Sequence, residues 1–167
     1  SIQHPENFYT YGFSWYNNPP AGYSWLNLWS AKNHEVGDIA YNNLVIKTVY
    51  DPCPAGFKMP EAKVFSAFTS NGTYTGYLNT TGTWTNGWNF NNKSSSPTTS
   101  IYFPAAGWRN SSDGSLSNVG SYGYYWTAMP QDERYDSYFL LFEQPAVNPK
   151  LGLPRAYGIS VRPVADY

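Results

Sequence analysis

The chain is poor in the residue types on which most metal centres and many enzymes depend. It holds one cysteine, Cys53, and two histidines, His4 and His34, among 167 residues. A single cysteine excludes both a disulfide within the chain and a zinc site built on a CxxC pair. Charged residues make up 13% and the net charge is −1, which argues against the basic face that nucleic acids select and against attraction to anionic membranes. No apolar run approaches the roughly 18 residues of a membrane-spanning helix.

Aromatic residues are what the chain has in excess. They form 19% of it, as 16 Tyr, 9 Phe and 7 Trp, a content far above that of disordered chains. The length corresponds to one domain, so we predict a single globular domain over residues 1–167. Because the sequence begins at Ser1 without a methionine or a signal peptide, we expect a targeting segment and further domains upstream of it.

Local patterns predict short elements joined by long loops. Apolar β-branched residues over Leu44–Tyr50 predict a strand. Pro60 followed by Glu61–Thr69, with three apolar residues on one face, predicts the only clear helix. These elements indicate an α+β fold class. Further strands are predicted over residues 101–103, 124–127, 137–142 and 157–164, a charged turn over 131–134, and proline-rich loops over 51–60 and 144–154.

Sequence motifs for catalysis are missing, including GxSxG, HExxH, Walker A and GxGxxG. Carboxylates cluster only at Asp132, Glu133 and Asp136. We interpret this cluster, beside Arg134, as a solvated hairpin tip, with a catalytic carboxylate pair as the alternative. Cys53 lies between two prolines and is either an inert buried thiol or a reactive one. We expect no catalytic residue, no metal ion and no cofactor.

The segment from residue 108 to 157 has the composition of a recognition surface. It mixes Trp, Tyr and Arg with Asn, Ser, Gly and Asp on expected loops. Tyr and Trp offer rigid contact area at a low entropic cost, and small polar residues add adaptable hydrogen bonds. The alternative is that these rings belong to the core, because many of the chain's aromatic residues must be buried there.

A proline-rich segment carries a resemblance to a known family. Asp51-Pro-Cys-Pro-Ala-Gly-Phe-Lys-Met-Pro60, followed at once by the predicted helix, resembles the DPCPxGwrvP signature of the Fibrobacter succinogenes major paralogous domain and related Bacteroides surface proteins. Other motifs of that family follow in the same order along nearly the whole chain. They are NLWS at Asn27–Ser30, FPAAGWR at Phe103–Arg109, YW at Tyr125–Trp126 and RAYGISVRPV at Arg155–Val164.

The C-terminal third resembles the variable region of Bacteroides-type target proteins of diversity-generating retroelements. In such regions a frame of fixed residues separates positions that are rewritten by adenine-directed mutagenic reverse transcription. Residues 108–164 carry mixed residues between frame positions. The frame is matched at Gly107, Arg109, Gly114, Leu116, Val119-Gly120, Tyr125-Trp126 and Ser160–Val164.

The resemblance implies a C-type-lectin-like fold of short antiparallel strands, one or two helices and long loops. In that fold the N- and C-terminal strands pair, and loops near the C-terminus form the ligand surface. The calcium-dependent members carry a Glu-Pro-Asn or Gln-Pro-Asp loop, which Glu143–Ala146 does not match, so no calcium site is expected. Trp126, Phe139, Leu141, Val161 and Pro163 are expected in the core.

The resemblance further implies a ligand-binding module on a bacterial or phage surface, as a lipoprotein or a pilus-tip subunit. Its partner would be a protein or glycan on another cell or host surface; neither nucleic acid binding nor membrane insertion is expected. The alternatives are a fixed pilus or cell-envelope subunit that contacts only its neighbours, and an enzyme. The predicted ligand-binding residues are Trp108, Asn110, Ser111, Asp113, Ser117, Asn118, Tyr122, Tyr124, Thr127, Met129, Asp132, Arg134, Asp136 and Tyr157.

Overall fold

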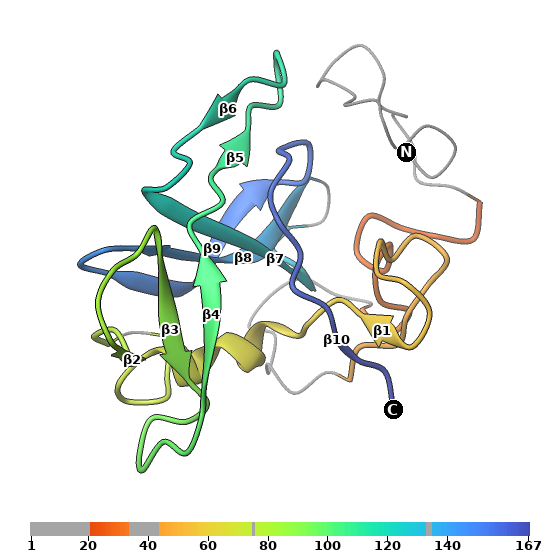
Figure 1. Cartoon of the computed structure of the whole chain (residues 1–167). Helices are drawn as coiled ribbons and strands as arrows, with labels where there is room; N and C mark the ends of the chain where they lie inside the picture. The colour runs from red at the N-terminus through yellow and green to blue at the C-terminus, as the bar shows by residue number, and fades with distance from the viewer. Residues whose placement is uncertain (1–20, 34–43, 75, 133–134) are drawn as a thin grey trace.

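A three-stranded antiparallel sheet forms the centre of the protein (Figure 1). The computed structural model describes residues 21–33, 44–74, 76–132 and 135–167. In the central sheet, β8 lies between β7 and β9. Three smaller antiparallel sheets surround it, so the described chain consists mostly of short antiparallel strands with one short helix. The bounds are β1 (Phe57–Lys58), η1 (Ala62–Phe68), β2 (Thr80–Thr81), β3 (Gly87–Asn91), β4 (Ser100–Pro104), β5 (Trp108–Arg109), β6 (Leu116–Ser117), β7 (Tyr122–Pro130), β8 (Asp136–Glu143), β9 (Val147–Pro154) and β10 (Val164–Ala165).

One face of the central sheet packs on the helix and on the sheet β2–β3–β4. Successive strand residues point to opposite faces, and Tyr125 of β7 shares one face with Leu140 and Phe142 of β8. These three side chains pack on aromatic residues of η1, β3 and β4. The rings meet at close range, with centroids 4.1 Å apart for Phe68 and Phe90. We call this buried set the first cluster; it comprises Phe65, Phe68, Phe90, Phe103, Ala105, Tyr125, Leu140, Phe142 and Val147.

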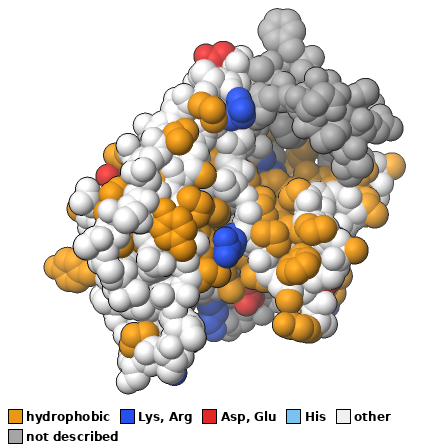
Figure 2. Space-filling model, viewed as in Figure 1, with side chains coloured by type: hydrophobic (Ala, Val, Ile, Leu, Met, Phe, Trp, Pro, Cys, Tyr) orange, Lys and Arg blue, Asp and Glu red, His pale blue; other side chains and the backbone are white. Residues whose placement is uncertain are grey.

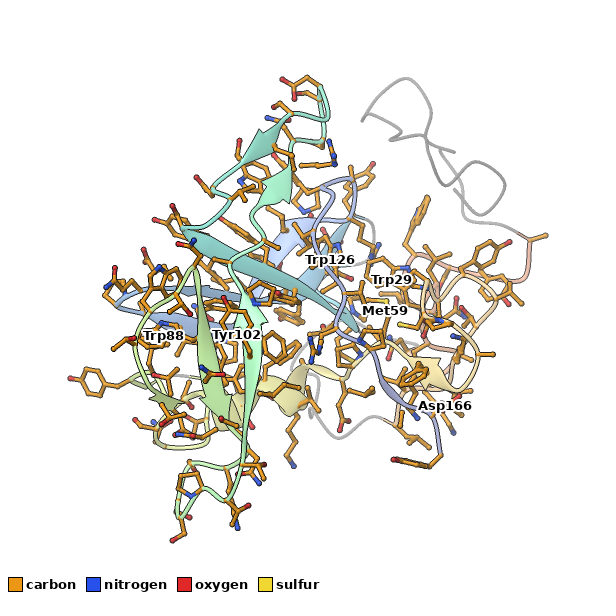
Figure 3. All side chains as sticks on the ribbon, viewed as in Figure 1. Trp29, Met59, Trp88, Tyr102, Trp126 and Asp166 are labelled. Carbon is orange, nitrogen blue, oxygen red and sulfur yellow. The ribbon has the colours of Figure 1, made fainter. Side chains whose placement is uncertain are left out.

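The other face of the sheet packs on loops from both ends of the described chain. The side chains on this face include Trp126 of β7 and Phe139 of β8, which the strand register places directly opposite each other. Figure 3 shows Trp126 on the sheet side and Trp29 and Met59 on the loop side of this contact, and the two indole centroids lie 5.8 Å apart. We call this buried set the second cluster; it comprises Val45, Cys53, Met59, Trp126, Ala128 and Phe139.

The predicted helix forms, and it is a 3-10 helix. It covers Ala62–Phe68 and starts after Glu61, so Pro60 precedes the helix rather than occupying its first turn. A 3-10 helix has three residues per turn, which aligns side chains at every third position. Ala62, Phe65 and Phe68 follow that spacing and are all buried. The apolar spacing that predicts the helix therefore fits this narrower form.

The strand predicted over Leu44–Tyr50 is wrong. In this segment the structure has only an isolated bridge between Ser30 and Lys47. Leu44 and Val49 are 62% and 68% exposed, whereas Val45 and Thr48 are buried, so the segment packs one side on the second cluster without joining a sheet. Side-chain contacts hold the segment in place, because the Lys47 ammonium donates to the carbonyls of Cys53, Pro54 and Phe57.

Two further predictions fail in the C-terminal third. Residues 144–154 were expected as a loop, and β9 occupies most of them. Proline is tolerated on an edge strand and at a bulge, and Pro149 meets both conditions. Among the described residues, β9 pairs with no strand other than β8. Its register with β8 shifts between Phe139 and Leu141, opposite the segment that contains Pro149. The strand expected over 157–164 is broken into isolated bridges at Gly158 and Ser160 and the short β10.

The core residues predicted from the sequence are confirmed only in part. Trp126 and Phe139 are buried as expected. Leu141 and Val161 are partly buried against the second cluster. Pro163 is exposed, because it follows the segment that leaves the sheet for β10. The strands predicted over 101–103, 124–127 and 137–142 are confirmed within β4, β7 and β8.

A buried carboxylate organises the proline-rich loop that leads to β1. Asp51 is 6% exposed. It accepts hydrogen bonds from the backbone N–H of Cys53 at 2.8 Å and of Met59 at 2.9 Å, and the Lys47 ammonium lies 3.7 Å away. The loop thus delivers β1 to β10, where Phe57 pairs with Ala165.

Replacing Asp51 with alanine should destabilise the protein by about 2–3 kcal/mol, because two buried N–H donors lose a charged acceptor. Urea unfolding followed by tryptophan fluorescence measures the loss. Asp113→Ala is the matched control, since Asp113 lies exposed in the β5–β6 turn and its loss should cost no more than about 0.5 kcal/mol. Equal stabilities for the two variants would contradict the role of Asp51.

Candidate functional site

Half-buried aromatic side chains gather at one end of the central sheet. We call Trp108, Tyr122, Tyr124 and Tyr157 the aromatic platform. The centroid of the Trp108 ring lies 4.7 Å from that of Tyr157 and 6.2 Å from that of Tyr124. The centroids of the Tyr122 and Tyr124 rings are 6.1 Å apart. These distances are those of interacting aromatic pairs. The platform is therefore one continuous surface and not a set of separate rings.

The platform is anchored to the core by stacking. The Tyr124 ring is stacked on Phe139, with centroids 5.9 Å apart, and Phe139 packs edge-on to Trp126 at 5.9 Å. Both partners belong to the second cluster. The row of rings thus runs from the buried interior to the half-exposed platform, so the platform residues are held by packing as well as by the strand.

Pairing between distant segments brings the rings together. Tyr122 and Tyr124 share a face of β7 because they are two residues apart. The backbone of Arg109 exchanges hydrogen bonds with Gly158, at 2.7 and 3.1 Å. This isolated bridge places Trp108, from the β5–β6 hairpin, beside Tyr157, which lies nearly fifty residues later in the chain.

A polar rim borders the platform at the β5–β6 hairpin and the turn that follows it. Asn118 is exposed, and its amide donates to the Tyr124 hydroxyl at 3.2 Å. Asn110 and Asp113 accept hydrogen bonds from Ser112 and Ser115, respectively. The bond from the Ser115 backbone N–H lowers the pKa of Asp113. Asn110 and Asp113 therefore shape the turn, while Ser111, Ser117 and Asn118 complete the rim.

Two predicted ligand-binding residues are buried in the core. Thr127 is 0% exposed and its hydroxyl donates to the Tyr138 carbonyl at 2.9 Å. Met129 is 2% exposed and packs with Ala62 of the helix. Neither side chain reaches a ligand at the surface. Their prediction as contact residues fails because β7 is covered on both faces, which its own sequence does not reveal.

The predicted acidic residues belong to a different part of the molecule. Asp132 and Asp136 lie beyond the far end of β7, about 25 Å from Tyr122 at the usual rise of a strand. Asp132 accepts hydrogen bonds from the backbone N–H groups of Tyr135 and Asp136, at 2.7 and 2.9 Å. The carboxylate of Asp132 thus stabilises the β7–β8 turn, as a hairpin tip requires. Arg134 lies outside the described residues.

A half-buried arginine adjoins that turn. Arg155 donates from Nε to the Ser137 hydroxyl at 2.9 Å and from Nη2 to the Asp136 carbonyl at 3.1 Å. Its guanidinium carbon lies 5.6 Å from the centre of the Trp29 ring. Burial lowers the pKa of Arg155 to about 10 and raises that of Asp136. These contacts connect the turn to the loop that carries Trp29, which is a structural use of the charges.

A shallow pocket beside the platform was missed by sequence reasoning. It has a volume of about 270 Å³. Tyr122 contributes to both the platform and the pocket, and the register of β7 and β8 pairs it with Glu143. No local pattern could have identified the pocket, because its walls come from three separate segments. They are Trp84, Gly120, Ser121, Tyr122, Glu143, Gln144 and Pro145.

The described residues contain no group of three or more His, Cys, Asp and Glu side chains placed to hold a metal ion. Within the same residues, no helix has the length and hydrophobicity to cross a membrane. Cys53 is buried, at 7% exposure. Burial, and then the hydrogen bond and charge of Asp51, raise the pKa of the Cys53 thiol to about 12. A thiol with this pKa stays protonated at neutral pH, which is the chemistry of an inert side chain.

Comparison with known proteins gives one match. A family model described as a domain of unknown function (DUF8237) matches residues 57–164. This range starts at β1 and ends at the first residue of β10, and it contains both the platform and the pocket. No curated protein and no solved structure matches the chain.

Cys53 in the folded protein should resist alkylation. At about pH 8, a thiol of unperturbed pKa is substantially ionised, whereas a thiol with a pKa of about 12 is about one ten-thousandth thiolate. We expect iodoacetamide to modify the native protein at least about 100-fold more slowly than the urea-unfolded protein, as read by intact mass. Rapid labelling of the native protein would instead indicate an accessible, reactive thiol.

Proposed function

The chain belongs to the DUF8237 family, and we propose that this member is a ligand-binding module whose contact surface is the aromatic platform. The observation that carries the proposal is the gathering of Trp108, Tyr122, Tyr124 and Tyr157, all half-exposed, at one end of the sheet. Three separate segments supply these rings. The ligand is a protein or a glycan on another cell or host surface, and the module is displayed outside the cell or on its surface.

The composition of the platform suits recognition. Tyr and Trp are enriched among the residues that contribute most to binding, since each buries a large area with few rotatable bonds. The indole N–H of Trp108 is buried and has no hydrogen-bond acceptor among the described residues. An unpaired buried donor is uncommon in folded proteins. The packing of the described residues therefore does not by itself account for the tryptophan at this position.

The fold offers support for a C-type-lectin-like scaffold. β1 and β10, near the two ends of the matched range, pair with each other, as that fold requires of its terminal strands. The central antiparallel sheet also agrees with it. We extend the proposal to this scaffold, on which loops near the C-terminus form the ligand surface.

Frame residues and the residues between them differ in burial and backbone conformation, and this difference supports sequence diversification at the positions between the frame residues. Gly107, Gly114 and Gly120 have φ values of 67°, 72° and 80°, where residues other than glycine are strained. Tyr125 and Trp126 are buried. These five frame positions thus have structural reasons to stay constant, although the frame positions Leu116 and Val119 are 59% and 60% exposed. The platform and rim positions are half-exposed or exposed. Changes at the latter positions would alter the surface at little cost to the fold.

Tyr122→Ala should weaken ligand binding by about 1–3 kcal/mol, the range of residues that dominate an interface, while leaving the fold intact. Binding is measured on arrays of printed glycans and of purified extracellular proteins, followed by titration of each binder. Asn118→Ala should weaken the same binding to a smaller extent. The matched control is Tyr77→Ala, because Tyr77 is 87% exposed and lies outside the platform.

Equal effects of Tyr122→Ala and Tyr77→Ala would contradict a platform site, and so would unfolding of the Tyr122 variant. The unfolding outcome would place Tyr122 in the core. Circular dichroism of each variant separates loss of binding from loss of structure.

Deep sequencing of the 3′ end of the gene across one cell lineage tests diversification. We expect substitutions restricted to template adenines, with a near-repeat and a reverse-transcriptase gene in the flanking DNA. The variable codons should fall at surface positions such as Asn110, Ser117, Asn118 and Tyr157, and should spare the buried Thr127. An invariant segment without a near-repeat would remove diversification from the proposal and leave a fixed binding surface.

A fixed assembly subunit is the second candidate, and one observation favours it. Leu44, Ile46, Val49 and Phe57 are 62%, 40%, 68% and 45% exposed. Figure 2 shows hydrophobic side chains gathered over the lobe that carries β1 and the preceding loops. Exposed apolar patches commonly mark protein–protein contacts. Self-association through this lobe, together with no binder on either array, would favour the assembly subunit over the ligand-binding module.

A further inference from the structure

The pocket lies between β7 and the β8–β9 turn, with Trp84 as a further wall. We propose that it binds one neutral pyranose residue of a glycan, at a site distinct from the aromatic platform. Its lining shares only Tyr122 with the platform. The proposal therefore stands on residues that the platform does not use, above all Trp84, Glu143 and Gln144.

The aromatic wall of the pocket is fixed by the core. The Trp84 ring packs edge-on against Trp88 and Phe142, with centroids 5.6 and 6.3 Å away. Phe142 is fully buried in the first cluster. Trp84 itself is only partly buried, so part of its indole is left to line the pocket. An exposed part of an immobilised indole offers a stacking surface for the C–H face of a sugar at low entropic cost.

The polar wall is positioned by the sheet and not by a mobile loop. Tyr122 and Glu143 are directly paired across β7 and β8, and the nearby Glu143 carboxylate raises the pKa of the Tyr122 hydroxyl. The indole N–H of Trp88, labelled in Figure 3, donates to the Glu143 carbonyl at 3.2 Å. The Glu143 N–H donates to the Ala146 carbonyl at 2.9 Å and closes the β8–β9 turn. The backbone that carries the Glu143 carboxylate is therefore held in place from two sides.

The opposite rim is equally constrained. The N–H of Gly120 donates to the Ala105 carbonyl at 2.7 Å, and the N–H of Ser121 donates to the Asn118 carbonyl at 3.1 Å. Gly120 has a φ of 80°, a conformation that lets the chain turn sharply into β7. The rim thus brings the Ser121 hydroxyl towards the same hollow that Glu143 lines.

The combination of groups selects the ligand class. The pocket offers hydroxyl and amide donors, from Ser121, Tyr122 and Gln144, together with carboxylate and carbonyl acceptors, next to an indole. A sugar hydroxyl both donates and accepts, so it uses both kinds of group. A lysine or arginine side chain would use the acceptors alone and would leave the donors unpaired. Glu143 is the only charged residue in the lining, and its negative charge disfavours acidic sugars.

The size of the pocket sets the size of the ligand. Its volume of about 270 Å³ is slightly below the range of about 300–1,000 Å³ that is usual for small-molecule sites. That space accommodates one ring, and the open mouth lets the rest of a glycan extend into solvent. Binding of a single sugar at such a shallow site is expected in the millimolar range, about 1–10 mM.

The test is a titration of ¹⁵N-labelled protein with methyl β-glucopyranoside, methyl β-galactopyranoside and N-acetylglucosamine. The indole N–H resonance of Trp84 is assigned as the one that disappears in Trp84→Phe, a variant that keeps a ring in the core. We expect at least one of these sugars to shift that resonance. Glu143→Gln, which preserves the shape of the side chain, should weaken the interaction at least about tenfold.

Two variants separate this site from the platform. Tyr157→Ala, on the platform and outside the pocket lining, should leave the sugar affinity unchanged and should weaken binding of a platform ligand. Glu143→Gln should leave binding of any array-identified platform ligand unchanged. Failure of the platform proposal would thus appear as equal loss in Tyr122→Ala and Tyr77→Ala, whereas failure of the pocket proposal would appear only in the sugar titrations.

Two outcomes would overturn the pocket proposal. One is the lack of any shift of the Trp84 resonance with all three sugars at concentrations about tenfold above the expected dissociation constant. The other is a shift produced by Nα-acetyl-lysine methylamide and by none of the sugars, which would make the pocket a site for a cationic side chain of a protein. A shift with N-acetylneuraminic acid alone would likewise contradict the assignment to neutral sugars.

Discussion

Burial of both faces of β7 and β8 is the constraint on which the rest of the structure depends. Tyr125 packs into the first cluster and the next residue, Trp126, into the second, so two hydrophobic cores share one pair of strands. The outer edge of β7 is also covered, because the Trp126 N–H donates to the Ser160 carbonyl at 2.9 Å and the Ser160 N–H donates to the Tyr124 carbonyl at 3.2 Å. Phe142 lies so close to the strand that a methyl group on Gly123 would be 2.1 Å from its Cζ atom. Glycine at this position is therefore a packing requirement.

The aromatic platform is the open end of the same arrangement. Its rings continue a stacked row that begins with Trp126 and Phe139 in the interior. A recognition surface built on packed rings keeps its shape before a ligand arrives, which reduces the entropy lost on binding. Because of this stacking, the platform positions differ in how well they tolerate substitution. Tyr124 is stacked on a core ring, whereas Tyr122 lies at the edge beside the pocket, so variation at Tyr122 perturbs the core less.

Local sequence patterns predict an element well where one property dominates. The spacing of Ala62, Phe65 and Phe68 identifies the helix, and the apolar, aromatic run over residues 137–142 identifies a strand. Patterns mislead where contacts with other segments determine the secondary structure. The β-branched run at Leu44 finds no neighbouring strand, while Pro149 is accepted in β9 because that strand is at an edge and bulged. For the candidate site, residue type indicates the platform rings, but it also selects Thr127 and Met129, whose burial depends on what covers β7.

The sequence by itself determined the chemistry available to the protein. One cysteine, two histidines, little charge and many aromatic rings define the side chains that the fold can bring together, because side-chain chemistry is a local property. Only the tertiary structure decided which rings meet. Trp108 and Tyr157 come together through a single bridge between Arg109 and Gly158, and Trp84 joins Glu143 through the packing of two sheets. Such contacts depend on strand register and on the covering of each face, which are properties of the whole chain and not of any segment.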